Sequence, residues 1–354
     1  MRVGIDCRMI THPGIGTYIK GLLDEFSKTS KNFVIFGDKS DLKTYAGFQI
    51  VEFKSPIYSL SEQLTGPSIF KNLDLLHVPH FNIPLNYKGK LVVTIHDIIY
   101  LFGNKFLPRN FYANFMIKNC LCRANKIIVV SRNTKNDLKK YFPDSETSKI
   151  EIIYEASRPV FCKINNQEIL TQTKNKYNLP NKFILYVGSI REHKNLKTLI
   201  NAYMRIKNRV DEALILVGRL DKREKQILNL IKKNNIIYVG EVPEKDLVSI
   251  YNLASLFVMP SLYEGFGLPI LEAMSCGVPV VSSRAASLPE VVGDAGMLVN
   301  PKNSEAFSEA IYSILCNNQL RDNLIKLGFE QVKKFSWRTC AEKTLEVYNN
   351  ALRN

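Results

Sequence analysis

The segment SLYEGFGLPILEAMSCGVPVV, residues 261–281, carries two glutamates, Glu264 and Glu272, on either side of a predicted helix start. A short apolar run precedes it and ends in a proline. Pro269 suits the first turn of a helix, and Gly277 is typical of a helix end. The segment therefore predicts a strand, a loop and a helix, with Glu264 ahead of the helix and Glu272 in its first turn.

Two glycines leave the backbone at this helix start accessible to a ligand. Gly265 and Gly267 come just before it, where peptide N–H groups have no partner inside the helix. Three such groups would bind an anion, most readily a diphosphate: those of Phe266, Gly267 and Leu268. Carboxylates beside that anion suit a hydroxyl-rich ligand, because each accepts two hydroxyl protons. The simpler interpretation, in which both glutamates only interact with the helix dipole for about 0.3 to 1 kcal/mol each, stays open.

Outward from this segment, short apolar runs alternate with longer helical patterns, which is typical of parallel sheets wrapped by helices. A chain of 354 residues exceeds the roughly 250 to 300 that one core usually serves, so we expect two domains. A polar stretch with prolines, residues 155–181, is predicted to link them. The expected strands are residues 2–6, 32–36, 49–53, 74–78, 91–95, 126–130 and 150–154 before the linker, and 183–187, 214–218, 236–240, 256–260, 279–283 and 296–300 after it.

The net charge of +15 is spread evenly, with +8 (22 Lys and Arg against 14 Asp and Glu) in residues 1–160 and +7 (26 against 19) in residues 161–354. Neither half is a dedicated basic module, so we expect no nucleic-acid partner; an acidic small substrate or an anionic membrane surface suits this charge better. The densest basic run, residues 116–142, is interpreted first as a solvated face and second as a membrane contact. The N-terminus lacks the apolar core of a signal peptide and no run could span a bilayer, so we expect a cytoplasmic protein that contacts the inner face of the membrane.

The residues of the opening segment also carry a resemblance. EGFGLPILEAMSCGVPVV is similar to the C-terminal signature of the retaining GT-B glycosyltransferases of family four, the group 1 glycosyltransferases. LYVGSIREHKNLKTLINAY, VGEVPEKDLVSIYNLASLFVMPS and FSWRTCAEKTLEVY resemble further segments of that family. The resemblance implies two doubly wound Rossmann-like domains facing across a cleft. It implies an acceptor-binding domain at residues 1–160, a nucleotide-sugar-binding domain at 161–335, and a C-terminal helix at 336–354 that crosses back onto the first domain.

The same resemblance assigns roles to residues of the second domain. Glu264 would bind the transferred sugar, Glu272 the ribose of the nucleotide, and Lys194 the diphosphate. The family often has an arginine where this chain has Ser189, and Arg191 is the nearest candidate for that charge. The remaining expected donor-binding residues are Val242, in the base-contacting turn, and the helix-start residues Gly265, Phe266, Gly267 and Leu268.

The first domain is expected to supply the other wall of the site. HPGIGTYIKGLLDEF, residues 12–26, resembles the glycine loop of the family near the leaving phosphate, with Gly14 and Gly16 opening a helix. A dinucleotide fingerprint would need a third small residue where Ile19 stands, which argues against NAD. His96 ends a predicted strand, and under the resemblance it contacts the transferred sugar. Other histidines of this domain, His77 and His80, are interpreted as core residues, with a place at the acceptor side as the alternative.

None of the aspartates is followed by another two positions later, so we expect no metal site of the Asp-x-Asp type and no cofactor. The predicted function is retaining transfer of a hexose from a nucleotide diphosphate sugar to a glycan or lipid-linked acceptor. A likeness to bacterial mannosyltransferases of surface polysaccharide assembly makes GDP-mannose the first candidate donor. Two alternatives stay open: a nucleotide-sugar epimerase of the same fold, and an inactive scaffold that binds sugar nucleotides.

Overall fold

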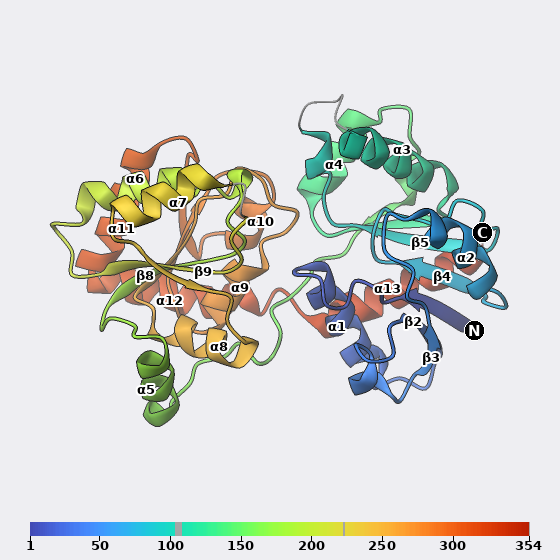
Figure 1. Ribbon diagram of the computed structural model, residues 1–354, viewed down its shortest axis with the longest axis horizontal. Helices are drawn as coiled ribbons and strands as arrows, with labels where there is room; N and C mark the ends of the chain where they lie inside the picture. The colour runs from blue at the N-terminus through green and yellow to red at the C-terminus, as the bar shows by residue number, and fades with distance from the viewer. Residues whose placement is uncertain (103–107, 222–223, 354) are drawn as a thin grey trace. The chain divides into compact units, whose positions relative to one another are not determined.

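The computed structural model describes residues 1–102, 108–221 and 224–353. Its contacts divide the chain into two compact units. The first unit holds Met1–Ala156 and the segment from Ser336 onward, and the second is Ser157–Phe335. The second unit thus begins slightly ahead of the residue 161 expected from the sequence. Both units are parallel α/β sheets with helices on their faces (Figure 1).

The sheet of the first unit has seven strands in the order β3-β2-β1-β4-β5-β6-β7, all paired in parallel. Strand order reverses between β1 and β4, because the chain adds β2 and β3 on one side and β4 to β7 on the other. The strands are β1 (Arg2–Asp6), β2 (Asn32–Gly37), β3 (Gln49–Glu52), β4 (Leu75–Val78), β5 (Lys90–Ile95), β6 (Lys126–Val129) and β7 (Ile150–Ile152). The α-helices are α1 (Ile15–Phe26), α2 (Leu60–Ile69), α3 (Pro108–Arg123), α4 (Arg132–Tyr141) and α13 (Trp337–Arg353).

The last helix of the chain, α13, packs inside the first unit against α1, β4, β5 and β6 (Figure 1). A side chain at Gly21 of α1 would lie 2.3 Å from the ring of Trp337, so the two helices approach closely there. The phenol of Tyr348 lies 2.6 Å from Nδ1 of His77, whose Nε2 lies 2.8 Å from the hydroxyl of Thr94. These buried hydrogen bonds tie the C-terminal helix to the central strands.

The sheet of the second unit has six parallel strands in the order β10-β9-β8-β11-β12-β13. Here strand order reverses between β8 and β11. Helix α6 contacts α7 and α11, whereas α9 contacts α8 and α10, as a doubly wound sheet requires (Figure 1). The strands are β8 (Phe183–Val187), β9 (Ala213–Val217), β10 (Ile237–Gly240), β11 (Leu256–Met259), β12 (Val280–Ser283) and β13 (Gly296–Val299). The α-helices are α5 (Gln167–Lys176), α6 (Leu196–Ile206), α7 (Lys225–Lys233), α8 (Glu244–Leu253), α9 (Leu268–Ser275), α10 (Leu288–Val292), α11 (Ser304–Cys316) and α12 (Asn318–Val332).

Every strand expected from the sequence is present, with ends that differ by at most two residues. The predicted linker is wrong for residues 167–176, which form α5 and pack on α8. Asn166 caps this helix by accepting hydrogen bonds from the N–H groups of Glu168 and Ile169. A polar helix with few buried residues shows only a weak apolar periodicity in its sequence. Its stability comes from packing on α8, which the sequence pattern does not reveal.

Candidate active site

The loop after β8 carries Lys194. It lies at the reversal of strand order between β8 and β11, and ligands of open α/β sheets bind outside the carboxyl ends of strands at such points. The loop runs through a 3₁₀ turn, Glu192–Lys194, into α6, and Asn195 joins the two with φ of 56°. The Asn195 amide donates to the carbonyls of Pro260, at 2.9 Å, and Pro301, at 2.7 Å. Asn195 therefore holds the Lys194 loop against the ends of β11 and β13.

The loop after β11 brings Glu264 to this lysine. Nζ of Lys194 lies 2.6 Å from Oε1 and 2.8 Å from Oε2 of Glu264, and the two side chains are 16% and 12% exposed. The hydroxyl of buried Ser287 lies 2.9 Å from the carbonyl of Glu264 and 2.8 Å from that of Phe266, which fixes the loop. An ammonium and a carboxylate that are 70 positions apart in the sequence thus form one ion pair at the switch point.

Helix α9 starts directly after this loop. Gly267 is its N-cap with φ of 117°, a conformation that side chains rarely adopt. Within the described part of the chain, the N–H groups of Gly265, Gly267 and Leu268 donate no hydrogen bond. The ring of Phe266 is buried and packs against Phe335, with centroids 5.7 Å apart. The free N–H groups and the Lys194 ammonium are the groups that an anionic ligand needs.

Glu272 lies in the second turn of α9, and the prediction of the first turn is wrong. The helix begins at Leu268, with Pro269 in its first turn as expected, and that turn contains no acidic residue. The buried Tyr251 phenol donates a hydrogen bond of 2.9 Å to Oε2 of Glu272. Burial raises the pKa of Glu272 to about 7, and the Tyr251 hydrogen bond opposes that rise. Glu272 therefore changes charge near neutral pH.

Arg191 and Val242 lie in loops at the carboxyl ends of strands. Arg191 precedes the 3₁₀ turn and is exposed, and its carbonyl accepts a hydrogen bond of 2.9 Å from the Lys194 N–H. Its side chain has no ion-pair partner among the residues described. Val242 is half-buried between β10 and α8. Both residues lie in loops of the kind that border ligands, but neither makes a contact that identifies a particular ligand.

In the first unit, Gly14 and Gly16 open α1 as expected. Gly14 is the N-cap with φ of 81° and is exposed. Gly16 is buried, and a side chain there would lie 2.3 Å from the carbonyl oxygen of Ile10. Glycine is therefore favoured for different reasons at the two positions: an unusual backbone conformation at Gly14 and close packing at Gly16.

His96 follows β5 and is held from both sides of its ring. Its Nδ1 lies 3.0 Å from Oε1 of Glu155, and its Nε2 lies 3.2 Å from the carbonyl of Pro79. The ring of Tyr18 meets it edge to face, with centroids 5.0 Å apart. The His96 side chain keeps 13% of its surface exposed. Its ring is fixed in orientation at the carboxyl edge of the first sheet.

The interpretation of His77 and His80 as core residues is confirmed. His77 is fully buried, and both ring nitrogens have partners in Tyr348 and Thr94. His80 is 8% exposed and bonds to the phenol of Tyr58 at 3.0 Å. Burial lowers the pKa of each histidine to about 3, so both are neutral at physiological pH.

Of the predicted site residues, the structure brings together Lys194, Glu264 and the helix-start glycines, all in the second unit. Gly14, Gly16 and His96 belong to the first unit. Three residues that support the site were missed: Asn195, Ser287 and Tyr251. Asparagine tolerates the left-handed conformation that the Lys194 loop needs, so Asn195 had a usable signal. The other two act through contacts with residues far along the chain.

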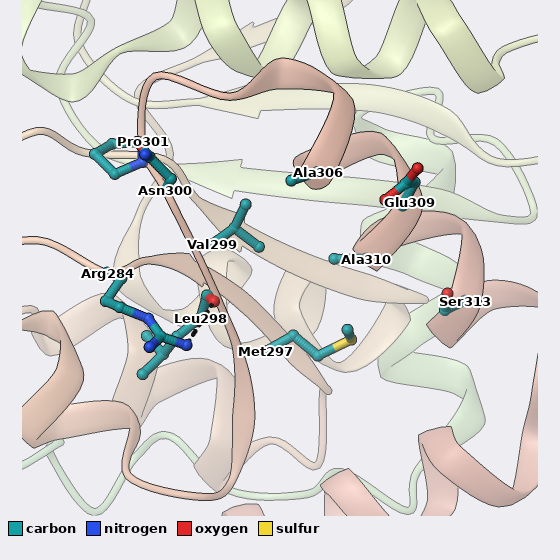
Figure 2. A pocket seen from close by; sticks show the side chains of 10 residues that line it. All are labelled: Arg284, Met297, Leu298, Val299, Asn300, Pro301, Ala306, Glu309, Ala310 and Ser313. Atoms are coloured by element: carbon teal, nitrogen blue, oxygen red, sulfur yellow. Dashed lines mark hydrogen bonds between the residues drawn. The ribbon is translucent and has the colours of Figure 1, made fainter.

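A hollow of about 680 Å³ also lies in the second unit, between β13 and α11 (Figure 2). Its lining is mostly apolar or backbone, with Arg284 and Glu309 as charged side chains. The Arg284 guanidinium reaches the carbonyl of Leu298 at 3.5 Å. None of the predicted site residues lines this hollow, so it is separate from the Lys194 and Glu264 pair.

Residues 1–102, 108–221 and 224–353 contain no group of three His, Cys, Asp or Glu side chains that could hold a metal ion. None of their helices combines the length and apolar character needed to cross a membrane.

Comparison with known proteins identifies the family. The family model described as "Glycosyl transferases group 1" matches residues 169–331, and that described as "Glycosyltransferase Family 4" matches residues 14–156. The O-antigen chain mannosyltransferase B of Escherichia coli is 34% identical over 283 residues, which are 77% of this chain and 74% of that protein. The serotype-specific mannosyltransferase WbdA of Escherichia coli is 30% identical over 78% of this chain, which spans only 35% of WbdA.

The fold agrees with that of solved glycosyltransferase structures. The crystal structure of Anabaena HepE in complex with UDP and glucose superposes with a TM-score of 0.80, at 18% identity, over 98% of this chain and 99% of that one. Its two parallel-sheet α/β domains are those of the GT-B fold. The match of both units to family models, and the extended identity to a mannosyltransferase, lead to one conclusion: this chain belongs to the group 1 glycosyltransferases.

Proposed function

We propose that this chain is a hexosyltransferase that uses a nucleotide diphosphate sugar, with GDP-mannose as the first candidate. The acceptor is a hydroxyl group of a glycan or of a lipid-linked glycan. The observation that carries the proposal is the Lys194 and Glu264 ion pair beside the free N–H groups at the start of α9. The mannosyltransferase names of its relatives support the choice of sugar.

Each part of the donor binds the protein groups whose charge complements its own. The diphosphate binds the Lys194 ammonium and the N–H groups of Gly267 and Leu268, which carry the positive end of the helix dipole. When a phosphate replaces Glu264 as the partner of the Lys194 ammonium, the carboxylate of Glu264 can accept hydrogen bonds from sugar hydroxyls. Glu272, held by Tyr251, accepts hydrogen bonds from the ribose in its ionised form.

Transfer breaks the bond between the anomeric carbon and the phosphate oxygen and forms a bond to the acceptor oxygen. Negative charge develops on the leaving diphosphate, and Lys194, with Arg191 beside the same loop, stabilises it in place of a metal ion. The acceptor enters on the face that the phosphate leaves, and a phosphate oxygen takes its proton. The configuration is therefore retained. His96, oriented by Glu155, hydrogen-bonds the sugar rather than attacking it.

The test incubates the purified chain with radiolabelled GDP-mannose, UDP-glucose or ADP-glucose, with and without a mannose oligosaccharide. Transfer of label to the oligosaccharide with release of nucleotide is expected. A new sugar nucleotide would instead mean an epimerase, and tight binding without turnover would mean a scaffold. Thermal shifts with GDP, UDP and ADP rank the bases, since a ligand at about 100 times its Kd adds roughly 2.7 kcal/mol to the stability of the folded state.

The role of Lys194 has its own variant. Loss of one well-aimed anion-stabilising donor costs about 2.7 to 4 kcal/mol in the transition state, so Lys194→Ala is expected to lower kcat by roughly a hundredfold or more. Lys197→Ala, which removes an exposed ammonium from the adjacent helix α6, is the control and is expected to change kcat little. Equal kcat in the Lys194 variant and the wild type would exclude this lysine from the mechanism.

A lipid-linked acceptor implies contact with a membrane surface. Helix α3 presents Phe111 and Phe115, which are 71% and 47% exposed, one turn apart on a face that continues to exposed Lys118. Apolar rings beside cations suit an anionic lipid surface. Replacing both phenylalanines with serine is expected to reduce sedimentation with phosphatidylglycerol vesicles at least severalfold. Equal sedimentation of variant and wild type would remove α3 from this contact.

A further inference from the structure

Tyr58, between β3 and α2, has φ of 68°. This left-handed region is unfavourable for a bulky side chain. The other non-glycine residues described with positive φ are four asparagines and one alanine, and asparagine tolerates this conformation. An aromatic residue in such a conformation persists only where its surroundings enforce it, and these positions cluster at ligand sites.

A buried charged network enforces the conformation. The Tyr58 N–H donates to Oε2 of Glu62 at 2.9 Å, and Oε1 of Glu62 lies 2.6 Å from the guanidinium of Arg8. Arg8 in turn pairs with Asp6 at 2.5 Å, and the amide of Asn82 donates to Glu62. The side chains of Arg8, Asp6 and Glu62 are at most 5% exposed. Burying charges is expensive, and one of the groups that this network holds in place is the backbone of Tyr58.

The network sits at the switch point of the first unit. Arg8 follows β1 and His80 follows β4, the neighbouring strands between which strand order reverses. Ligands of open α/β sheets bind outside the carboxyl ends of strands at this point. His96, which follows β5, reaches the same edge, with its Nε2 3.2 Å from the carbonyl of Pro79, the residue before His80. Tyr58 is therefore held at the edge where the acceptor side of the proposed reaction would lie.

The ring of Tyr58 is rigid but accessible. Its hydroxyl bonds to His80, and its ring packs against Phe81 and Tyr112 with centroids 6.3 and 5.7 Å apart. The residue nevertheless stays 48% exposed. A fixed aromatic ring offers a large contact area at low entropic cost, and its electron-rich face attracts the slightly positive C–H groups of a pyranose.

We propose that Tyr58 is a stacking platform for a pyranose ring of the acceptor glycan, built at the β1 and β4 switch point. This inference rests on the proposed transferase function and specifies its acceptor side. The strained loop and its buried ion pairs then serve recognition, because they present one ring in a fixed orientation.

Two variants separate the ring from the backbone. Tyr58→Gly accepts the positive φ without strain and removes the ring, whereas Tyr58→Phe keeps the ring and loses the hydroxyl. Tyr141→Ala, which removes a 37% exposed ring from α4, is the control. With mannotriose as acceptor, Tyr58→Gly is expected to raise the acceptor KM by about tenfold and the donor KM much less. Tyr58→Phe is expected to stay within about twofold of the wild type.

Saturation-transfer NMR with mannotriose gives a readout that needs no turnover. Loss of the mannotriose signal in Tyr58→Gly and its retention in Tyr141→Ala would support the platform even if the wild type transfers no sugar, an outcome that would contradict the proposed function alone. An unchanged acceptor KM in Tyr58→Gly of an active enzyme would overturn the platform alone. So would an equal loss in Tyr58→Gly and Tyr58→Phe, because the hydroxyl rather than the ring would then be responsible.

Discussion

Glu272→Gln is expected to stabilise the protein at high pH while weakening nucleotide binding. Burial holds the pKa of Glu272 at about 7, against an ordinary value of 4.5. The folded state therefore binds this proton more tightly than the unfolded state does. As the pH rises from 4.5 to 7, folding must proceed with an increasingly charged, half-buried carboxylate, and the free energy of unfolding falls.

The magnitude follows from the difference between the two pKa values. About 2.5 pH units at 1.36 kcal/mol each gives a cost of about 3 kcal/mol above pH 7, of which less than about 1 kcal/mol is present at pH 5. Glutamine is neutral at every pH and does not carry this cost. The stability difference between Glu272→Gln and the wild type should therefore grow by about 2 to 3 kcal/mol between pH 5 and pH 8.

The assay is urea unfolding at pH 5 and pH 8, followed by circular dichroism. Tryptophan fluorescence in the same samples reports the first unit separately, because the single tryptophan, Trp337, belongs to it. Glu330→Gln, which removes a 61% exposed carboxylate from α12, is the control. GDP affinity is measured alongside and should fall in Glu272→Gln, since the ribose loses a charged acceptor. A stability difference that is the same at both pH values would refute the reasoning.

Two more variants test the contacts around the site. Tyr251→Phe removes the hydrogen bond that opposes the raised pKa of Glu272, so the pH at which donor affinity reaches half its maximum should rise; an unmoved pH profile would contradict a positioning role for Tyr251. Gly16→Ala places a methyl group 2.3 Å from the Ile10 carbonyl and should destabilise the first unit by about 1 to 3 kcal/mol in urea unfolding. Gly14→Ala meets no atom within 4 Å and is the comparison variant, whose cost comes from backbone strain at φ of 81° and not from a steric clash; equal stability of the Gly16 variant and the wild type would mean that the loop yields.

The site was predictable where a single loop carries the chemistry. Gly265 and Gly267 precede α9 as the sequence indicates, and Glu264 lies ahead of the helix. The turn that holds Glu272 was predicted wrongly: Pro269 lies in the first turn as expected, but the helix begins at Leu268, which places Glu272 in the second turn. Helix ends depend on a few backbone hydrogen bonds, which a residue pattern defines only to within one or two positions.

The supporting residues were less visible. Tyr251 looks like one apolar residue of a helix, and its phenol gains a role only through Glu272, 21 positions further on. The same holds for Glu62, an ordinary helix-start glutamate in the sequence, which in the fold meets Arg8, 54 positions earlier. A residue type states what a side chain can bond to, and the fold decides which partner is within reach.

The sequence by itself determined the alternation of strands and helices, the presence of two α/β units, and the family to which the chain belongs. These properties follow from local periodicity and from short motifs, and each motif consists of residues that are close together in the chain. Tertiary structure alone decided the order of the strands and the pairing of Lys194 with Glu264. These contacts join residues far apart in the chain, and they form only when parallel strands bring their carboxyl ends to one edge of a sheet.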